Sequence, residues 1–373
     1  MRDILYPIFF AQCTRRSCRC KGGRSPALIY VWTMSKSALL RFTDRGIYCP
    51  AGEFYIDPWR PVERALLTHG HADHARPGHN RYLSTDIAAP VISHRLNNPV
   101  LETVRYGETR QIKDALVSFH PAGHIPGSAQ IRIEVAGEIW VVSGDYKIEN
   151  DGLTTPFEPL KCHSFISECT FGLPAFQWQP QNTIFDQINT WWAETAKAGK
   201  CCILGAYGLG KAQRLLCGLD ANIGPILTHS ATEATNQILR DQGFDLPKTQ
   251  KIMPDTDRKA QRGALILAPP SVFGSAWAKR FGETSTGFVS GWMALRGIRR
   301  RRGFDRGFVL SDHADWPALN AAIKETGAEN IFVTHGYTDI FNNWLNEQGY
   351  NSNIVKTDFT GDEAELPEEE SAE

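Results

Sequence analysis

Short apolar runs alternate with helical patterns through most of the chain. Apolar and β-branched runs predict strands at 65–68, 116–120, 130–135, 139–143, 164–167, 201–205, 224–228, 264–268, 307–310 and 330–334. Amphipathic spacing predicts helices at 183–198, 211–219, 232–242, 316–325 and 340–347. The first of these helices carries one apolar stripe, made of Ile184, Phe185, Ile188, Trp191 and Trp192. This alternation indicates an α/β protein with mixed sheets.

The two ends of the chain depart from this pattern. Residues 1–33 show no sustained period and hold six basic residues against one acidic residue, whereas residues 362–373 hold seven acidic residues and no basic one. We expect an N-terminal extension over 1–44, with Met34 as the biological start, and an acidic, disordered tail over 358–373. No secretory leader is expected, because arginines stand where its cleavage site should follow the first apolar patch.

Composition excludes several classes of protein. The 373 residues are 42% hydrophobic and 22% charged, which argues against intrinsic disorder and leaves room for two or three domains. No apolar run approaches the ~20 residues that a bilayer span needs, so no membrane partner is expected. Nine cysteines at irregular spacing are typical of reduced thiols rather than a disulfide framework, and this predicts a cytoplasmic protein.

The most informative segment is ALLTHGHADHARPG, residues 65–78. A predicted strand ends at Thr68, and His69, His71, Asp73 and His74 follow within six residues. Imidazole and carboxylate groups are the ligands that zinc and similar divalent ions prefer, and a turn that leaves a strand can direct several of them at one point. The alternative, a polar surface loop, explains a single histidine better than it explains four ligand-type residues at this spacing.

The H-x-H-x-D-H run resembles the signature of the metallo-β-lactamase superfamily, which has an αββα sandwich fold. The other motifs of that family follow in order. Asp57 in FYIDPW matches the aspartate that supports the signature loop, His124 in PAGHIPGSA matches the next metal ligand, and Asp145 in VVSGDY matches the carboxylate that bridges two ions.

The remainder of the chain is similar to the β-CASP nucleases. Glu168 in ISECTFGLP, His313 in LSDHADW and His335 in VTHGY match the three additional motifs of that branch. With GAYGLGKAQRL, these motifs look most similar to bacterial DNA ligase-associated exonucleases. The resemblance implies a metallo-β-lactamase domain over 45–173 and 305–357, interrupted by an inserted α/β β-CASP domain over 174–304.

The resemblance also implies roles for particular residues. His69, His71, His124 and Asp145 would hold one zinc ion, and Asp73, His74, Asp145 and His335 the other, with manganese as the alternative metal. Two ions can clamp the attacking and leaving oxygens of a phosphodiester and lower the pKa of bound water. His313 is the candidate general acid and Glu168 the group that orients its ring, while Asp57 and Asp73 complete the candidate catalytic set.

Two segments are candidates for binding nucleic acid. GAYGLGKA, with Tyr207 and Lys211, nearly fits the P-loop pattern, but Ala212 replaces the required hydroxyl residue, which argues against nucleotide hydrolysis. Its helix N-terminus could hold a phosphate, or it could be a turn that only packs the helix on its sheet. The arginine run with Arg296, Arg299 and Arg300 could follow a nucleic-acid backbone, or form an ordinary solvated surface.

The leading functional hypothesis is a zinc-dependent DNA exonuclease in ligase-associated repair, with an ATP-dependent DNA ligase and a helicase as partners. The first alternative is an RNA-processing endo- or exoribonuclease of the same fold, because the histidine at position 335 occurs in both branches of the family. A small-molecule metallohydrolase is disfavoured by the predicted insertion, by His313 and by the arginine run. A metal-free binding protein is disfavoured by the complete ligand set.

Overall fold

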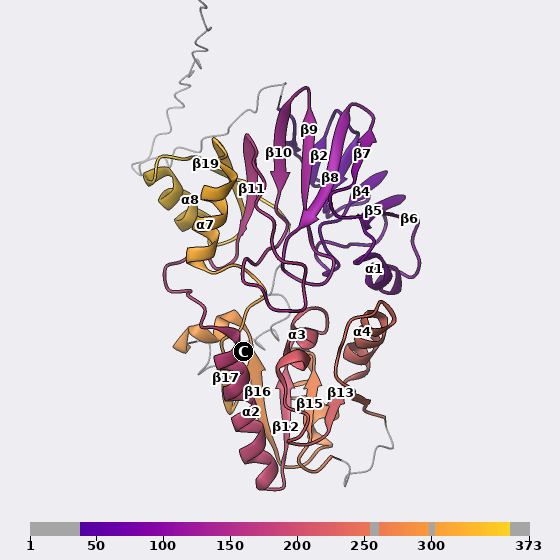
Figure 1. Ribbon diagram of the computed structural model, residues 1–373, viewed down its shortest axis with the longest axis vertical. Helices are drawn as coiled ribbons and strands as arrows, with labels where there is room; N and C mark the ends of the chain where they lie inside the picture. The colour runs from indigo at the N-terminus through magenta and orange to yellow at the C-terminus, as the bar shows by residue number, and fades with distance from the viewer. Residues whose placement is uncertain (1–37, 254–260, 298–302, 359–373) are drawn as a thin grey trace, which may run out of the picture. The chain divides into compact units, whose positions relative to one another are not determined.

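The computed structural model describes residues 38–253, 261–297 and 303–358, which form three sheets and their helices (Figure 1). The predicted start at Met34, most of the predicted N-terminal extension and nearly all of the acidic tail lie outside the described residues. Arg299 and Arg300 lie outside them as well.

The first sheet has six strands in sequence order: β1 (Arg41–Phe42), β2 (Ile47–Cys49), β3 (Phe54–Ile56), β4 (Arg64–Leu66), β5 (Arg81–Thr85) and β6 (Leu101–Val104). The first three strands are antiparallel, and β3 to β6 are parallel. Helix α1 (Ala89–Arg95) packs on this sheet, where Ile92 joins a cluster with Ala65 and Tyr82.

The second sheet places the carboxyl ends of several strands at one edge. Its order is β19 (Asn351–Ile354), β18 (Asn330–Gly336), β11 (Ser164–Cys169), β10 (Glu138–Val142), β9 (Ala129–Val135), β8 (Ala115–Pro121) and β7 (Thr109–Ile112). Strands β10, β11 and β18 are parallel to one another, and β8 and β10 are both antiparallel to β9. Strands β8, β10, β11 and β18 therefore end at the same edge of the sheet.

Aromatic side chains join the two sheets, and helices cover the second. Phe332 of β18 lies with its ring centroid 5.4 Å from that of Phe42 in β1 and 5.2 Å from that of Trp140 in β10. Helices α7 (Trp316–Thr326) and α8 (Thr338–Glu347) pack on the second sheet through a buried cluster that includes Leu319 and Phe341. These layers fit the sandwich that the sequence resemblance implies.

The third sheet is wholly parallel. Its order is β14 (Gln250–Lys251), β13 (Ile226–Thr228), β15 (Leu265–Ala268), β12 (Cys201–Gly205), β16 (Thr284–Val289) and β17 (Arg306–Phe308). The described helices of this part of the chain include α2 (Gln181–Lys197), α3 (Lys211–Gly218), α4 (Ser230–Asp241), α5 (Ala276–Lys279), η1 (Pro270–Val272) and η2 (Gly291–Ala294).

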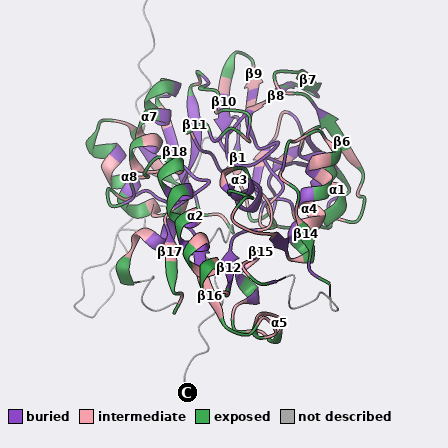
Figure 2. Ribbon diagram, turned by 60° about the horizontal axis from the view of Figure 1, so that its bottom comes forward, coloured by how far each residue is buried: buried purple, intermediate pink, exposed green. Residues whose placement is uncertain are grey.

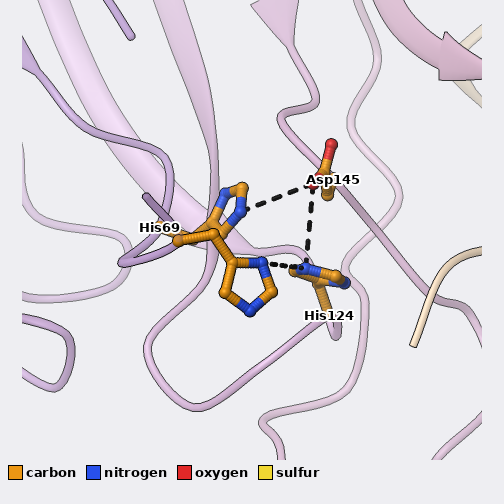
Figure 3. A group of neighbouring side chains, drawn as sticks. His69, His124 and Asp145 are labelled. Carbon is orange, nitrogen blue, oxygen red and sulfur yellow. Dashed lines mark hydrogen bonds and ion pairs between the residues drawn. The ribbon is translucent and has the colours of Figure 1, made fainter. Parts of the chain in front are cut away.

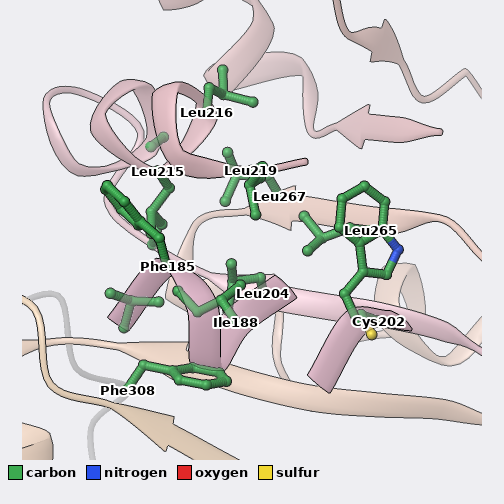
Figure 4. Close-up of a cluster of buried hydrophobic side chains, with 14 of the residues drawn as sticks. Phe185, Ile188, Cys202, Leu204, Leu215, Leu216, Leu219, Leu265, Leu267 and Phe308 are labelled. Carbon is green, nitrogen blue, oxygen red and sulfur yellow. The ribbon is translucent and has the colours of Figure 1, made fainter. Parts of the chain in front are cut away.

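The core of the third sheet follows from the predicted apolar stripe. Ile188 and Trp192 of α2 pack with Leu204 of β12 and Leu267 of β15 in one buried cluster, part of which is drawn in Figure 4. In Figure 2 the central strand β12 is largely buried, whereas α2 carries exposed residues on its outer side. Strands buried on both faces are expected where helices cover a parallel sheet.

The sequence located the longer helices and about half of the strands, and missed other strands of similar length. The ten predicted strands and five predicted helices all have counterparts, shifted by a few residues at their ends. The strand predicted at 307–310 begins at Arg306 and pairs with β16 in the third sheet. Strands β1, β2, β3, β5, β6, β7, β14, β16 and β19 and the short helices were not predicted. The division into the two predicted domains remains a prediction.

Within the residues that the structure describes, no helix has both the length and the apolar character needed to cross a bilayer.

Leu267→Ala should destabilise the protein, because the side chain is fully buried in the core of the third sheet and its removal leaves a cavity. We expect the free energy of unfolding to fall by about 2–5 kcal/mol in urea denaturation. Val100→Ala is the control, since Val100 is 65% exposed. Equal denaturation midpoints for the two variants would contradict this description of the core.

Candidate metal centre

A hydrogen-bonded aspartate supports the loop that follows β4. Asp57 accepts hydrogen bonds from the backbone N–H of Thr68 at 2.8 Å and from the Thr68 hydroxyl at 2.5 Å, and its Oδ2 lies 2.8 Å from Nδ1 of His74. Asp57 has a φ of +41°, a conformation that is unfavourable for a residue with a side chain. The strain of this conformation is typical of a functional site.

The other predicted ligands reach the loop from the shared edge of the second sheet. His124 follows β8, Asp145 follows β10, and His335 lies near the end of β18. His335 has a φ of +58°. It is the second non-glycine residue at the site, after Asp57, whose backbone lies in the left-handed region. Residues far apart in the chain therefore meet because their strands end at the same edge.

One group of ligand atoms could hold a single cation. The nitrogen or oxygen ligand atoms of His69, His71, His124 and Asp145 all lie within 4.8 Å of one another. His69 Nε2 is 3.4 Å and His124 Nε2 3.8 Å from Asp145 Oδ2, and His124 Nε2 is 3.1 Å from His71 Nδ1 (Figure 3). His69 Nε2 is buried and makes no hydrogen bond to any described residue, so the donor set fits a metal ion.

The remaining predicted ligands surround the same carboxylate. His74 Nε2 lies 3.5 Å from Asp145 Oδ2 and 3.8 Å from Asp73 Oδ2, and His335 Nδ1 lies 3.7 Å from Asp145 Oδ1. Asp145 thus stands between the first group and these three residues. The structure brings all seven predicted ligands together, and their roles as ligands remain a proposal.

The pKa values in this cluster reflect burial and opposed charges. Burial lowers the pKa of His69 well below its usual value, and His74 lowers it further. Burial and the nearby His313 do the same for His124. Neutral imidazole is the form that binds metals, so both rings are in the ligand state at neutral pH.

The pKa values of Asp145 and His74 shift so that both groups are charged. Burial alone would raise the pKa of Asp145, but the surrounding histidines, His74 first, hold it well below the usual value. Burial opposes the charge on His74, yet Asp145, Asp73 and Asp57 raise its pKa to about 10. In the absence of metal, a protonated His74 therefore partly balances the buried carboxylates.

The second nitrogen of four of the imidazoles is held by a neighbouring group. Thr68 Oγ1 lies 3.0 Å from His69 Nδ1, and Asp57 holds His74 Nδ1. The carbonyl oxygen of Leu209 lies 3.1 Å from His71 Nε2, and that of Asp312 lies 2.7 Å from His124 Nδ1. Such contacts fix the ring orientation and the tautomer, which leaves the opposite nitrogen to face the cluster.

Sequence reasoning found Asp57 but missed the two carbonyls. Leu209 precedes α3, and Asp312 stands beside the predicted acid His313. Backbone carbonyls are present at every residue, so no residue type signals them. Only the position of Leu209 within the P-loop-like motif could have drawn attention to this turn.

His313 and Glu168 form a buried pair next to the cluster. His313 Nδ1 lies 2.9 Å from each carboxylate oxygen of Glu168, and its ring centroid is 4.6 Å from that of His124. Glu168 also accepts hydrogen bonds from the Tyr146 backbone N–H at 2.8 Å and from the Thr170 hydroxyl. Its oxygens also lie near Asp145 and His335, but these donors make it better suited to orient His313 than to hold a metal.

Two of the predicted nucleic-acid-binding residues, Lys211 and Tyr207, contact each other inside the protein. Lys211 is 1% exposed, with Nζ 4.4 Å from the centroid of the buried Tyr207 ring and 3.8 Å from Asp312 Oδ2. Gln213 accepts the N–H of Gly210, one of the donors that a phosphate at this helix start would use. Arg296 is exposed. The structure thus places Lys211 and Tyr207 in the interior, and their phosphate-binding role remains a prediction.

Comparisons with known proteins identify nuclease relatives. No family model matches the chain. The chain is 30% identical over 308 residues to a protein named "Probable DNA ligase" from Opitutus terrae, a match that covers 82% of this chain and 30% of that protein. It is 32% identical over 128 residues to "Endoribonuclease YSH1" from Yarrowia lipolytica, covering 32% of this chain and 14% of the relative. The chain thus spans less than a third of either relative.

A solved structure supports the fold. A protein of unknown function from Enterococcus faecalis V583 superposes with a TM-score of 0.51 over 72% of this chain and 74% of that chain, at 10% sequence identity. This likeness supports the α/β fold, and the buried His/Asp cluster is consistent with a metallo-β-lactamase-like arrangement. The features of the centre are those of a metal-dependent hydrolase, and its relatives include proteins named as a ribonuclease and as a ligase.

Asp57→Ala should weaken metal binding although Asp57 is not a proposed ligand. The change removes the acceptor that holds Thr68 and His74, so we expect zinc affinity to fall about 10- to 100-fold in competition with a chelating indicator. Asp86→Ala, at an exposed aspartate, should leave the affinity unchanged. Wild-type affinity in the Asp57 variant would show that the loop does not need this support.

Proposed function

We propose that the protein is a zinc-dependent phosphodiester hydrolase that acts on DNA as an exonuclease, with manganese as the alternative ion. His69, His71, His124 and Asp145 would hold one ion, and Asp73, His74, Asp145 and His335 the second. Bound there, the ions would activate water and stabilise negative charge on the phosphate. The observation that carries the hydrolase assignment is the convergence of these ligand atoms around Asp145.

The protein's own groups supply the proton transfer. Glu168 accepts a hydrogen bond from His313 Nδ1, so Nε2 is the atom that can deliver a proton to the leaving sugar oxygen. Tyr146 and Thr170 donate to Glu168 and keep it in place.

The assignment to DNA rests on the similarity to the ligase-named protein. A segment that makes up 30% of that protein corresponds to 82% of this chain. A hydrolase joined to a ligase in one polypeptide would prepare ends that the ligase then seals. By this reasoning, the chain would process DNA ends in ligase-coupled repair, with an ATP-dependent DNA ligase and a helicase as partners.

The second candidate is an RNA-processing nuclease. The similarity to an endoribonuclease covers 32% of this chain, and the histidine at position 335, beside Asp145, is compatible with either polymer. Both candidates share the metal centre and the His313–Glu168 pair. They differ in the polymer that is cleaved, so substrate comparison separates them.

His71→Ala and Asp73→Ala should each lose nuclease activity and bound zinc together, because both residues belong to the proposed ligand set. Zinc is measured by elemental analysis of the purified protein and activity on end-labelled strands. His163→Ala, outside the cluster, is the control. Full activity in either ligand variant would exclude this site.

Matched DNA and RNA strands, labelled separately at the 5′ and 3′ ends, should distinguish the candidates. We expect mononucleotides to be released progressively from one end of the DNA, with little cleavage of the RNA. Preferred cleavage of RNA would favour the second candidate, and internal cuts in DNA would contradict the exonuclease assignment.

His313→Ala should retain zinc but lose about 100- to 10,000-fold in the rate of cleavage, which is the usual contribution of a general acid. The loss should be smaller for a substrate whose leaving group is a nitrophenolate, because that anion needs no proton. An equal loss on both substrates would contradict the role of His313 as the acid.

A further inference from the structure

Arg214 is a fully buried arginine that joins four segments of the chain. It lies in α3, and its side chain is 1% exposed. Its Nη1 donates to the carbonyl oxygen of Ser311 at 2.6 Å and to Asp312 Oδ1 at 3.1 Å. Its Nη2 donates to Glu149 at 3.1 Å, and its Nε donates to Gln181 at 3.0 Å.

These contacts fix the segment that orients a proposed metal ligand. The carbonyl oxygen of Asp312, which lies 2.7 Å from His124 Nδ1, belongs to the residue whose side chain Arg214 holds. Arg214 also binds the carbonyl of the preceding residue, Ser311. The segment from Ser311 to His313 is therefore held from the α3 side, and both His124 and the proposed acid depend on its position.

The start of α3 reaches a second ligand. The carbonyl oxygen of Leu209 lies 3.1 Å from His71 Nε2. Gly210 has a φ of +90°, and a Cβ there would lie 2.1 Å from the Ile125 side chain, next to His124. The turn into α3 thus packs directly against the loop that carries His124. One helix contacts the surroundings of both His71 and His124.

Charge balance makes the arrangement stable in the interior. Arg214, Lys211 and Lys147 face Asp312, Asp151 and Glu149. Burial would raise the pKa of Asp312, but these cations lower it, so the carboxylate stays ionised. A planar guanidinium can serve four acceptors at fixed angles, which a lysine ammonium cannot do.

We propose that Arg214 is a positioning residue of the metal centre, which sets the Asp312 carbonyl that orients His124 and so determines the affinity for the metal. This inference rests on the proposed metal binding. The inference goes further than metal binding itself. Residues of α3, which follows β12 of the third sheet, would set the geometry of ligands that follow strands of the other two sheets.

The test compares Arg214→Lys with Arg240→Lys. Arg240 of α4 is the matched control, because it also donates to a carboxylate, a hydroxyl and a carbonyl, those of Glu233, Thr249 and Pro247, but contacts none of the proposed ligands. Zinc affinity is measured by competition with a chelating indicator, and ligand geometry by the visible absorption of the cobalt-substituted protein. Arg214→Lys should weaken zinc binding about 10- to 100-fold and alter the cobalt spectrum, while Arg240→Lys should match the wild type.

Glu149→Ala provides a milder variant should Arg214→Lys fail to fold. Glu149 is partly exposed, and the substitution removes a single partner of Arg214. It should shift the cobalt spectrum in the same direction by a smaller amount. A wild-type spectrum and affinity in whichever of these variants folds overturns the inference. A wild-type protein that binds neither zinc nor cobalt would contradict both the proposed function and this inference. Wild-type metal binding in the folded variants contradicts this inference alone, so the two failures are distinguishable.

Discussion

The structure depends on the burial of one carboxylate, Asp145, among imidazoles. A buried anion is costly unless it is paired, and four histidines place a ring nitrogen within 3.8 Å of its oxygens. Those rings are themselves mostly buried and come from three places in the chain, since His69 and His74 share the loop after β4. The carboxylate and the rings therefore require one another, and a cation bound among them would satisfy both. The strand ends of the second sheet and the loop after β4 are arranged around this requirement.

Hydrogen bonds around the centre convert this convergence into a defined geometry. Asp57 and Glu168 each accept from both backbone and side chains, so each carboxylate fixes a loop as well as a histidine. Two residues with side chains, Asp57 and His335, adopt left-handed backbone conformations to take part. These conformations are higher in free energy than extended or helical backbone, and the strands that flank them hold them in place, as is common at functional sites.

The sequence was informative where chemistry requires a particular side chain. The four ligand-type residues after Thr68, and the aspartates and histidines found in order after them, could be identified because few other residues bind metals. Long amphipathic elements such as α2 were also predicted. Short strands such as β2 and β3 were not, because three residues carry no measurable period. Lys211 shows the limit of motif reading: the pattern allowed either a phosphate site or a turn that packs its helix, and the fold buries the side chain against Tyr207 and Asp312.

The turn that contains Leu209 has a consequence for how such proteins can be shortened or recombined. Excising the segment that forms the third sheet would leave a smaller two-sheet protein with all seven ligand side chains but without the carbonyl that holds His71 or the guanidinium that holds Asp312. Such a minimal protein would keep the proposed ligand side chains but lose contacts that orient His71 and His124. An exchange of this segment between related proteins would succeed only if the donor segment presented an equivalent carbonyl and cation at the same junction.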